Sequence, residues 1–273
     1  CSPKTKIVFL KVHKTGSSTV ANIFQRFGVT RDLNFAVPRK KPHEHGYNYI
    51  GKPGETIHSD LLLPFPEGES YDILWNHVTY NRTAFRSVMP PETVYVSIIR
   101  EPFDQFVSAF EYYKMYNMAY IKKIMSVNVT NPISTYLQNF SRVEAPSRRL
   151  SYVRNKMVAD FGMTLKQLSS NSKRREFFEN INKDFKLVMI MEYFDESLIL
   201  LRRTLCWNHK DIIYFSQNKN PFRPRRLFSS EDHRRHKELS KADYELYNYF
   251  YGKFVRKMSA EGGDFFEEVR HFR

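Results

Sequence analysis

A hydrophobic run that turns abruptly into a polar loop and then into an amphipathic helix is the feature that most constrains this chain. Residues 6–12 are rich in β-branched and apolar side chains, which is typical of a buried strand. A polar loop follows at residues 13–16. From Ser17 onward, apolar residues recur at helical spacing, at Val20, Ile23, Phe24 and Phe27. Gly28 is predicted to end this helix in a left-handed conformation.

The loop between strand and helix has the composition of an anion-binding site. The first N–H groups of a helix have no intrahelical partner, and the helix dipole adds partial positive charge there. Gly16 allows close approach of the backbone to a phosphate, and Lys14 adds a full charge. Hydroxyl donors are predicted at Thr15, Ser17, Ser18 and Thr19. The Walker A pattern is absent because the lysine precedes the glycine. The alternative interpretation is an ordinary helix start after a buried strand.

Two further strands end in polar residues. The run at 71–75 ends in Asn76 and His77, and the apolar run at 93–99 ends in Arg100 and is followed by a predicted helix at 103–116. Because ligands of parallel sheets bind beyond the carboxyl ends of the strands, we expect His77 and Arg100 to lie at the same edge as the anion loop. A histidine in such a position can also be merely solvated.

The remaining pattern completes an α/β fold with a central, mainly parallel sheet flanked by helices. Ser108 lies in the second turn of the helix after Arg100, on a side that can face the same ligand. The other predicted elements are mostly helical structure at 117–173, a strand at 186–191, a helix capped by Asp195 and ending near Cys206, a short strand at 212–215, a polar connector at 218–235, and a last helix from Ser240.

Composition bounds the class of protein. The chain has 273 residues with 41% hydrophobic content, so it can bury a core, and we expect one domain spanning residues 1–273. The 43 basic and 29 acidic side chains give a net charge of +14, which favours polyanionic partners. No run of about 18 apolar residues is present to span a bilayer. The histidines between residues 31 and 66 match no zinc spacing, so no metal site is predicted.

The cysteines and glycosylation sequons bear on the cellular compartment. Cys1 and Cys206 could pair or remain free thiols. Sequons at Asn81, Asn128 and Asn139 favour the secretory pathway, where a disulfide between the two cysteines is expected.

Several of these motifs resemble those of one enzyme family, the galactose 3-O-sulfotransferases of the Golgi. Residues 9–19 resemble the family's 5′-phosphosulfate loop, and Arg100–Pro102 with Ser108 resemble its 3′-phosphate motif. Further similarity lies at residues 75–78, 191–198 and 205–207.

The resemblance implies a P-loop-like sulfotransferase fold. It implies transfer of the sulfuryl group of 3′-phosphoadenosine 5′-phosphosulfate (PAPS) to the 3-hydroxyl of a β-galactose on a glycolipid or glycoprotein glycan. It also implies a type II membrane protein of the Golgi lumen, and hence an N-terminal anchor that is missing from this sequence. The expected partner is a galactose-terminated glycan, with no role for nucleic acid.

The chemistry assigns roles to individual residues. A sugar hydroxyl must lose a proton to attack sulfur, and both the strand-end position and the resemblance favour His77 as the base. His13 is the competing base or a loop-shaping residue. Lys14 is expected to neutralise developing charge, while Lys11 is either a second catalytic cation or a surface lysine. The residues expected to bind the cofactor are His13, Lys14, Thr15, Gly16, Ser17, Ser18, Thr19, Arg100, Ser108 and Arg154.

Two other functions compete with this hypothesis. A heparan or uronyl 2-O-sulfotransferase shares the loop, the Asn-His pair and the Arg-Glu-Pro turn, but residues 192–197 favour the galactose family. A basic, non-catalytic protein that binds glycan or nucleic acid would leave the three strand-end motifs without a purpose.

Overall fold

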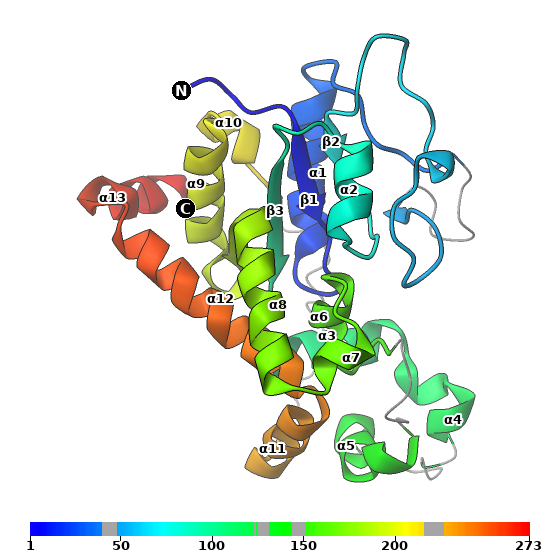
Figure 1. The fold of residues 1–273 in the computed structure, drawn as a ribbon. Helices are drawn as coiled ribbons and strands as arrows, with labels where there is room; N and C mark the ends of the chain where they lie inside the picture. The colour runs from blue at the N-terminus through cyan, green and yellow to red at the C-terminus, as the bar shows by residue number, and fades with distance from the viewer. Residues whose placement is uncertain (40–47, 123, 125–130, 144–150, 216–226) are drawn as a thin grey trace.

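A single four-stranded parallel sheet organises the molecule. The computed structural model describes residues 1–39, 48–122, 124, 131–143, 151–215 and 227–273. Their strands pair in the order β2-β1-β3-β4, all parallel, which confirms the α/β prediction (Figure 1). The strands are β1 (Ile7–Leu10), β2 (Ile73–Leu74), β3 (Val94–Ile99) and β4 (Phe185–Ile190).

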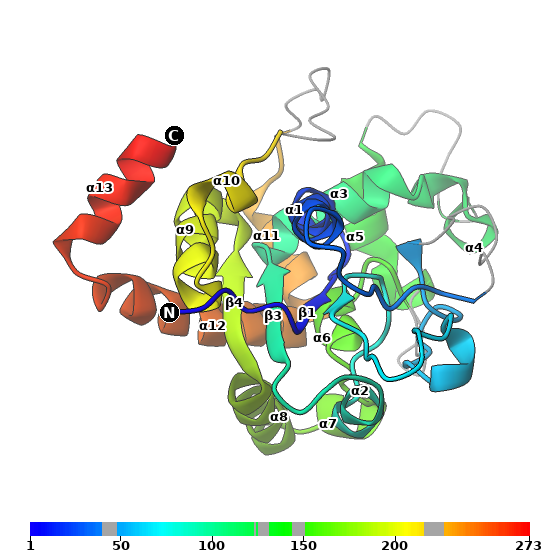
Figure 2. The same ribbon diagram turned by 90° about the horizontal axis from the view of Figure 1, so that it is seen from above.

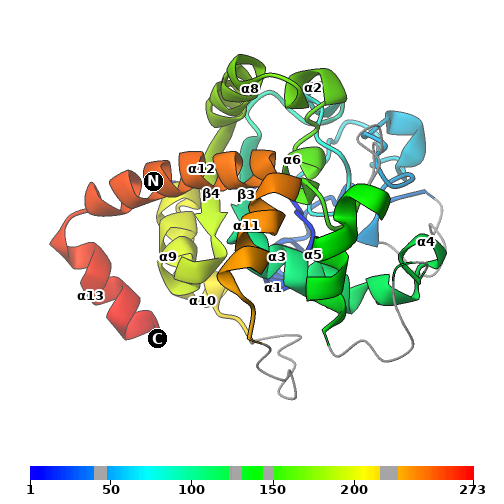
Figure 3. The ribbon, with the colours of Figure 1, turned by 90° about the horizontal axis from the view of Figure 1, so that it is seen from below.

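Helices cover both faces of this sheet. α1, α9 and α10 lie on one face, and α8 and α12 lie on the other, as the views along the strands show (Figures 2 and 3). The α-helices and 3₁₀ turns are α1 (Ser17–Val29), η2 (Ser59–Leu61), α2 (Arg82–Val88), α3 (Pro102–Tyr112), η3 (Met115–Asn117), α4 (Ala119–Lys122), α5 (Pro132–Val143), α6 (Lys156–Asp160), α7 (Leu165–Leu168), α8 (Asn171–Asp184), η4 (Met191–Tyr193), α9 (Phe194–Leu205), α10 (His209–Ile212), α11 (Ser230–Leu239), α12 (Lys241–Ser259) and α13 (Gly263–Phe272).

The apolar core lies between these layers. Every residue of β1 is fully buried, as expected for a central parallel strand covered on both faces. On the α1 face, Phe9 stacks on Phe24 with ring centroids 5.1 Å apart. A second apolar cluster joins α3, η3, α4, α5 and α11 beyond the carboxyl ends of the strands. The carboxyl edge of the sheet is therefore enclosed by helices rather than open.

The strand order creates a switch point at the carboxyl edge. The chain leaves β1 for β2 on one side and returns to β3 on the other. Connections that diverge in this way leave a crevice between the two neighbouring strand ends, where ligands of parallel sheets bind. The ends of β1 and β3 carry the anion loop and Arg100.

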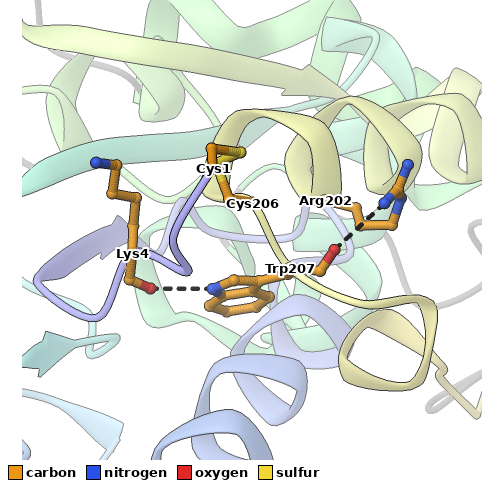
Figure 4. The surroundings of a disulfide bond; sticks show 5 residues. All are labelled: Cys1, Lys4, Arg202, Cys206 and Trp207. Atoms are coloured by element: carbon orange, nitrogen blue, oxygen red, sulfur yellow. Dashed lines mark hydrogen bonds between the residues drawn. A yellow bond between two sulfur atoms is a disulfide. The ribbon is translucent and has the colours of Figure 1, made fainter.

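A disulfide ties the start of the chain to the amino end of the sheet. Cys1 is bonded to Cys206, with Cα atoms 5.7 Å apart, which confirms the expected pairing (Figure 4). The Trp207 indole N–H donates to the carbonyl of Lys4 at 3.0 Å, and the Lys4 N–H donates to the carbonyl of Leu205 at 2.8 Å. These contacts join the chain start to the end of α9.

Several predicted boundaries are wrong. Gly28 lies inside α1 rather than at a left-handed end, and a Cβ there would meet the ring of Phe35 at 2.3 Å. Position 28 favours glycine because the ring of Phe35 packs against it. The helix after β3 ends at Tyr112 instead of continuing to residue 116, because Lys114 is left-handed. Tyr193, not Asp195, occupies the N-cap of α9.

The carboxyl-terminal third also differs from the prediction. Residues 209–212 form α10, and no strand is present at 212–215. Part of the expected polar connector is helical, as α11, and its first half lies outside the described residues. Ser240 does cap α12 as predicted, but α13 follows it. A short β-branched run is ambiguous between strand and helix, and its neighbours decided the outcome.

Two of the three sequon asparagines lie in the described part of the chain. Asn81 caps α2 by accepting the N–H of Ala84 at 3.0 Å, and Asn139 lies in α5. Asn128 lies outside the described residues. Within the described ranges, no helix combines the length and apolar character needed to cross a bilayer.

Candidate active site

The loop after β1 is folded by two left-handed residues. Lys14 has φ 61° and Gly16 has φ 76°, and α1 begins directly afterward. A Cβ at Gly16 would lie 2.4 Å from Sδ of Met191, so this position favours glycine on both conformation and space. Gly16 is the N-cap of α1 but makes no side-chain capping bond. The first N–H groups of a 13-residue helix therefore point toward the loop.

The four hydroxyl groups of the loop have different surroundings. Thr15 Oγ1 donates to the carbonyl of Val12 at 3.1 Å, and Ser17 Oγ donates to the same carbonyl at 2.6 Å. Both side chains are buried, so they hold the turn in shape. Ser18 is exposed at the first turn of α1 and Thr19 is nearly buried. Thr15 and Ser17 thus hold the fold of the loop, and the cofactor contacts predicted for the four hydroxyls remain predictions.

Lys14 lies against the end of α3. Its Nζ is 3.5 Å from the ring centroid of Tyr112, whose side chain is 63% exposed. A cation over an aromatic face is attracted to it electrostatically. This contact places the Lys14 side chain between the loop and the end of α3.

His77 has one ring nitrogen fixed by the neighbouring strand. Its Nδ1 lies 2.7 Å from the carbonyl oxygen of Lys11, and a carbonyl only accepts, so Nδ1 carries the hydrogen. The backbone on either side of the ring is tied to the edge of the sheet, with the N–H of His77 donating to Asn48 and its carbonyl accepting from Ile50. In the neutral ring, Nε2 then carries the lone pair and can accept a proton.

The surroundings keep this imidazole neutral. His77 is only 9% exposed, and burial lowers its pKa well below the usual value. The neighbouring His13 and Lys11 lower the pKa further. A positioned imidazole that is neutral near pH 7 has the state required of a general base.

His13 is engaged at both ring nitrogens. Its Nδ1 and its backbone N–H both lie within 2.9 Å of Oδ2 of Asp160, and its Nε2 is 3.2 Å from the hydroxyl of Tyr49. Gln105 donates to the carbonyl of His13 at 3.1 Å from α3. The His13 ring also stacks on His77, with centroids 4.0 Å apart. These contacts match the loop-shaping role for His13 better than the role of competing base.

Lys11 is buried beside the site, so the surface-lysine alternative is wrong. Its side chain is 5% exposed, donates to Oδ1 of Asn48 and lies 5.5 Å from the ring centroid of Trp75. Burial lowers the pKa of Lys11 to about 8. The cation is part of the histidine cluster.

The end of β3 supplies a third group at the same edge. Arg100 is about one-fifth exposed, and its Nη2 lies 3.3 Å from the exposed carboxylate of Asp104. Ser108 is half-buried two turns into α3. The turn is anchored by the N–H of Glu101, which donates to Glu192 at 2.9 Å. A screened contact to an exposed carboxylate leaves Arg100 available for a stronger anionic partner.

The remaining predicted residue lies elsewhere. Arg154 lines a cavity of about 310 Å³ together with Arg174 and Lys241, and none of the loop residues, His77 or Arg100 lines it. Among the described residues no group of three or more His, Cys, Asp or Glu side chains is arranged to hold a metal ion. His43 and His45 lie outside the described residues.

The structure also adds residues that the sequence did not indicate. Asp160 contacts His13 across 147 positions of sequence, and Tyr49 contacts it across 36. Neither belongs to a recognisable motif. Tyr49 forms a parallel bridge with His77. The one sequence signal that could have suggested Tyr49 is the expectation that ligand-binding residues gather where parallel strands end.

The comparisons with known proteins agree with this geometry. The family model described as galactose-3-O-sulfotransferase matches residues 1–273. The chain is 31% identical to galactosylceramide sulfotransferase of Mus musculus over 263 residues, covering 96% of this chain and 60% of that protein. It is 34% identical to galactose-3-O-sulfotransferase 2 of Homo sapiens over 266 residues, covering 96% and 63%.

A third relative gives the same result. The chain is 30% identical to galactose-3-O-sulfotransferase 3 of Mus musculus over 265 residues, covering 94% of this chain and 58% of that protein. The chain thus spans about 60% of the length of the curated relatives it matches. With a family model matched from end to end and an anion loop, a neutral imidazole and an arginine at one sheet edge, the chain belongs to the galactose-3-O-sulfotransferase family.

Proposed function

We propose that residues 1–273 form one catalytic domain that transfers the sulfuryl group of PAPS to the 3-hydroxyl of a β-galactose residue. Membership of the family supports the reaction. The observation that carries the assignment to this chain is the bond between His77 Nδ1 and the carbonyl of Lys11, 2.7 Å long. It leaves Nε2 as a proton acceptor at the edge of the sheet that also holds the anion loop.

The residues at this edge fit a nucleotide with phosphate groups at both ends. The N–H groups at the start of α1, with Lys14, suit the 5′-phosphosulfate, and Arg100 with Ser108 suits the 3′-phosphate. The left-handed turn at Gly16 supports this fit, because it brings the loop directly to the start of α1, and a side chain there would collide with Met191. PAPS supplies a sulfuryl group joined to a phosphate leaving group. Lys14 and the helix N–H groups stabilise the negative charge that develops there.

His77 acts on the acceptor. Its Nε2 takes the proton of the galactose 3-hydroxyl as that oxygen bonds to sulfur. The pKa of His77 is low without ligands, and the negative charge of a bound phosphosulfate raises it toward the working pH. Lys11 acts as a nearby buried cation that limits this rise. Arg154 remains a proposed cofactor contact on the strength of the sequence alone, since the cavity that it lines includes none of the other proposed cofactor residues.

We propose the Golgi lumen as the compartment. The Cys1–Cys206 disulfide supports an oxidising environment, since such bonds are rare in the cytosol. The acceptor is then a galactose-terminated glycan on a lipid or a protein.

A sulfate-transfer assay with labelled PAPS tests the proposal. The panel contains a lactoside, galactosylceramide, a galactose-terminated glycoprotein and desulfated heparan, and the sulfated position is read by NMR of the product. We expect 3-O-sulfated galactose from wild type, and a kcat lower by about 10²-fold or more for the His77→Ala variant. Transfer to heparan alone would indicate a 2-O-sulfotransferase. Binding of 3′,5′-bisphosphate without transfer to any member would indicate a non-catalytic protein.

A further inference from the structure

Three charged or titratable side chains are buried together behind the proposed base. Asp160 and Lys156 lie on α6, and His13 lies in the loop after β1, each less than 10% exposed. Asp160 Oδ1 pairs with Lys156 Nζ at 2.8 Å, while its Oδ2 faces Nδ1 of His13 at 2.8 Å and the backbone N–H of His13 at 2.9 Å. Burying such groups is costly unless they are paired, so their placement calls for a purpose.

The carboxylate dictates the state of His13. Burial raises the pKa of Asp160, but the contacts with His13 and with the Lys156 cation outweigh it and lower this pKa to about 2. An ionised carboxylate only accepts hydrogen bonds, so Nδ1 of His13 must carry the hydrogen. Nε2 of His13 then faces Tyr49 with its lone pair.

The His13 ring stacks on the His77 ring, so the orientation of one supports the orientation of the other. The two imidazoles lie 4.0 Å apart at 27°, and each has its Nδ1–H bound to a fixed oxygen. Each ring therefore has Nε2 as its basic atom, which in His13 faces the hydroxyl of Tyr49. The orientation of the His77 ring rests on the Lys11 carbonyl at one edge and on the His13 face.

α6 itself is held by a reciprocal cap with α12. Asp243 accepts the N–H groups of Met157 at 3.2 Å and Val158 at 2.8 Å. Asn155 in turn accepts the N–H groups of Ala242 and Asp243. A five-residue helix has little stability of its own, so this joint is what fixes Asp160 in place.

We propose that Asp160 is a positioning residue for the transfer reaction: it locks His13 in the Nδ1–H tautomer and so holds the His13 ring as the support on which His77 is oriented. Only the kinetic consequence of this proposal depends on the proposed function. The tautomer and the stacking are properties of the protein without substrate.

The test compares two double variants of equal charge. Asp160→Asn/Lys156→Met keeps an oxygen that can accept from His13, whereas Asp160→Leu/Lys156→Met removes it, and both eliminate the buried ion pair. The tautomer of His13 is read from the ¹³Cδ2 and ring ¹⁵N chemical shifts between pH 7 and 8. We expect the Nδ1–H tautomer in wild type and in the Asn/Met variant, and its loss in the Leu/Met variant.

Kinetics provide the second readout. In the Leu/Met variant we expect kcat to fall roughly 10²-fold, the cost of a misplaced catalytic group, with KM for PAPS within about twofold of wild type. The Asn/Met variant should stay within a few-fold of wild type. Asp184→Asn, at an ion pair with partly exposed arginines on the opposite edge of the sheet, is the control for loss of stability alone.

The outcomes separate the two proposals. Equal kcat in the two double variants would overturn the positioning role, and so would an Nε2–H tautomer of His13 in wild type, which needs no variant to fold. If wild type transfers no sulfate to any galactoside, the proposed function fails. The tautomer measurement then still decides whether Asp160 locks His13.

Discussion

Two buried aspartates, at opposite ends of the sheet, show how differently the same residue is used. Asp184 lies just before β4 and accepts from Tyr80 at 2.9 Å and from Arg82 at 2.8 Å, and the arginine remains 41% exposed. Asp160 lies near the carboxyl edge, and its partners Lys156 and His13 are both buried. The first pairing closes a surface between α2 and α8. The second concentrates charge inside the protein.

This difference separates a structural edge from a functional one. At the amino edge, the disulfide and the ion pairs of Asp184 connect elements and leave the cations solvated. At the carboxyl edge, burial lowers the pKa of His77, His13 and Lys11. Clusters of perturbed groups gather at active sites because catalysis needs unusual protonation states. Variants at the carboxyl edge should therefore change activity, and variants at the amino edge should change stability.

The largest effect is expected from Lys14→Ala. Loss of a preorganised charge directed at the developing negative charge should lower kcat by about 10²–10³-fold. Steady-state sulfate transfer measures this, with circular dichroism to verify folding. Lys253→Ala, at an exposed lysine of α12 whose Nζ lies 5.8 Å from the ring centroid of Tyr249, is a matched control. Retention of more than about a tenth of wild-type activity is incompatible with the role given to Lys14.

His77→Asn should follow closely. It retains polarity but cannot act as a base, so kcat should fall by about 10²-fold or more while affinity for 3′,5′-bisphosphate stays within twofold. In wild type, activity should be lost as the pH falls through the pKa of His77, because the protonated ring cannot accept a proton. Since burial lowers this pKa, the acid limb of kcat/KM should lie below the pH expected for an ordinary histidine. The same limb persisting in the Asn variant would point to another base.

Arg100→Ala should act on binding rather than on chemistry. Loss of a hydrogen bond to a charged group should weaken affinity for 3′,5′-bisphosphate by roughly 1.5–3 kcal/mol. Isothermal titration calorimetry measures this directly. Asp104→Ala, which removes the exposed partner of Arg100, should leave affinity unchanged or raise it. Identical affinities for wild type and Arg100→Ala would remove Arg100 from the cofactor site.

Cys1→Ser should have the smallest effect on turnover. It tests whether the amino edge contributes to stability and not to activity. Opening a loop that spans 205 positions should lower the free energy of unfolding by roughly 2–4 kcal/mol. Urea denaturation measures this loss, and kcat should be unchanged at temperatures where the variant is folded. A tenfold loss of kcat in fully folded protein would show that the amino edge also serves the reaction.

The accuracy of the sequence predictions depended on whether a signal was local. Three of the four sheet strands and the amphipathic helix at Ser17 follow clear patterns, and the predicted elements match β1, β3, β4 and α1 closely. The strand predicted at 212–215 and the helix end predicted at Gly28 were wrong. Both depend on contacts with distant residues, since Gly28 lies under Phe35 and the 209–212 helix packs against α9.

The candidate site shows the same limit. Lys14, His77 and Arg100 were predicted at one edge because each follows a strand directly. Asp160 and Tyr49 were not predicted, since their contacts with His13 link segments far apart in sequence. Nothing in the composition around Asp160 distinguishes it from other acidic residues.

The sequence by itself therefore determined the sheet, the anion loop and the three strand-end residues. These follow from hydrophobic periodicity and from the rule that parallel strands present their carboxyl ends together. The tertiary structure alone decided which nitrogen of His77 carries the lone pair, which hydroxyls fold the loop and which carboxylate binds His13. Protonation and tautomer depend on burial and on hydrogen bonds between groups brought together only by folding, so no local pattern can encode them.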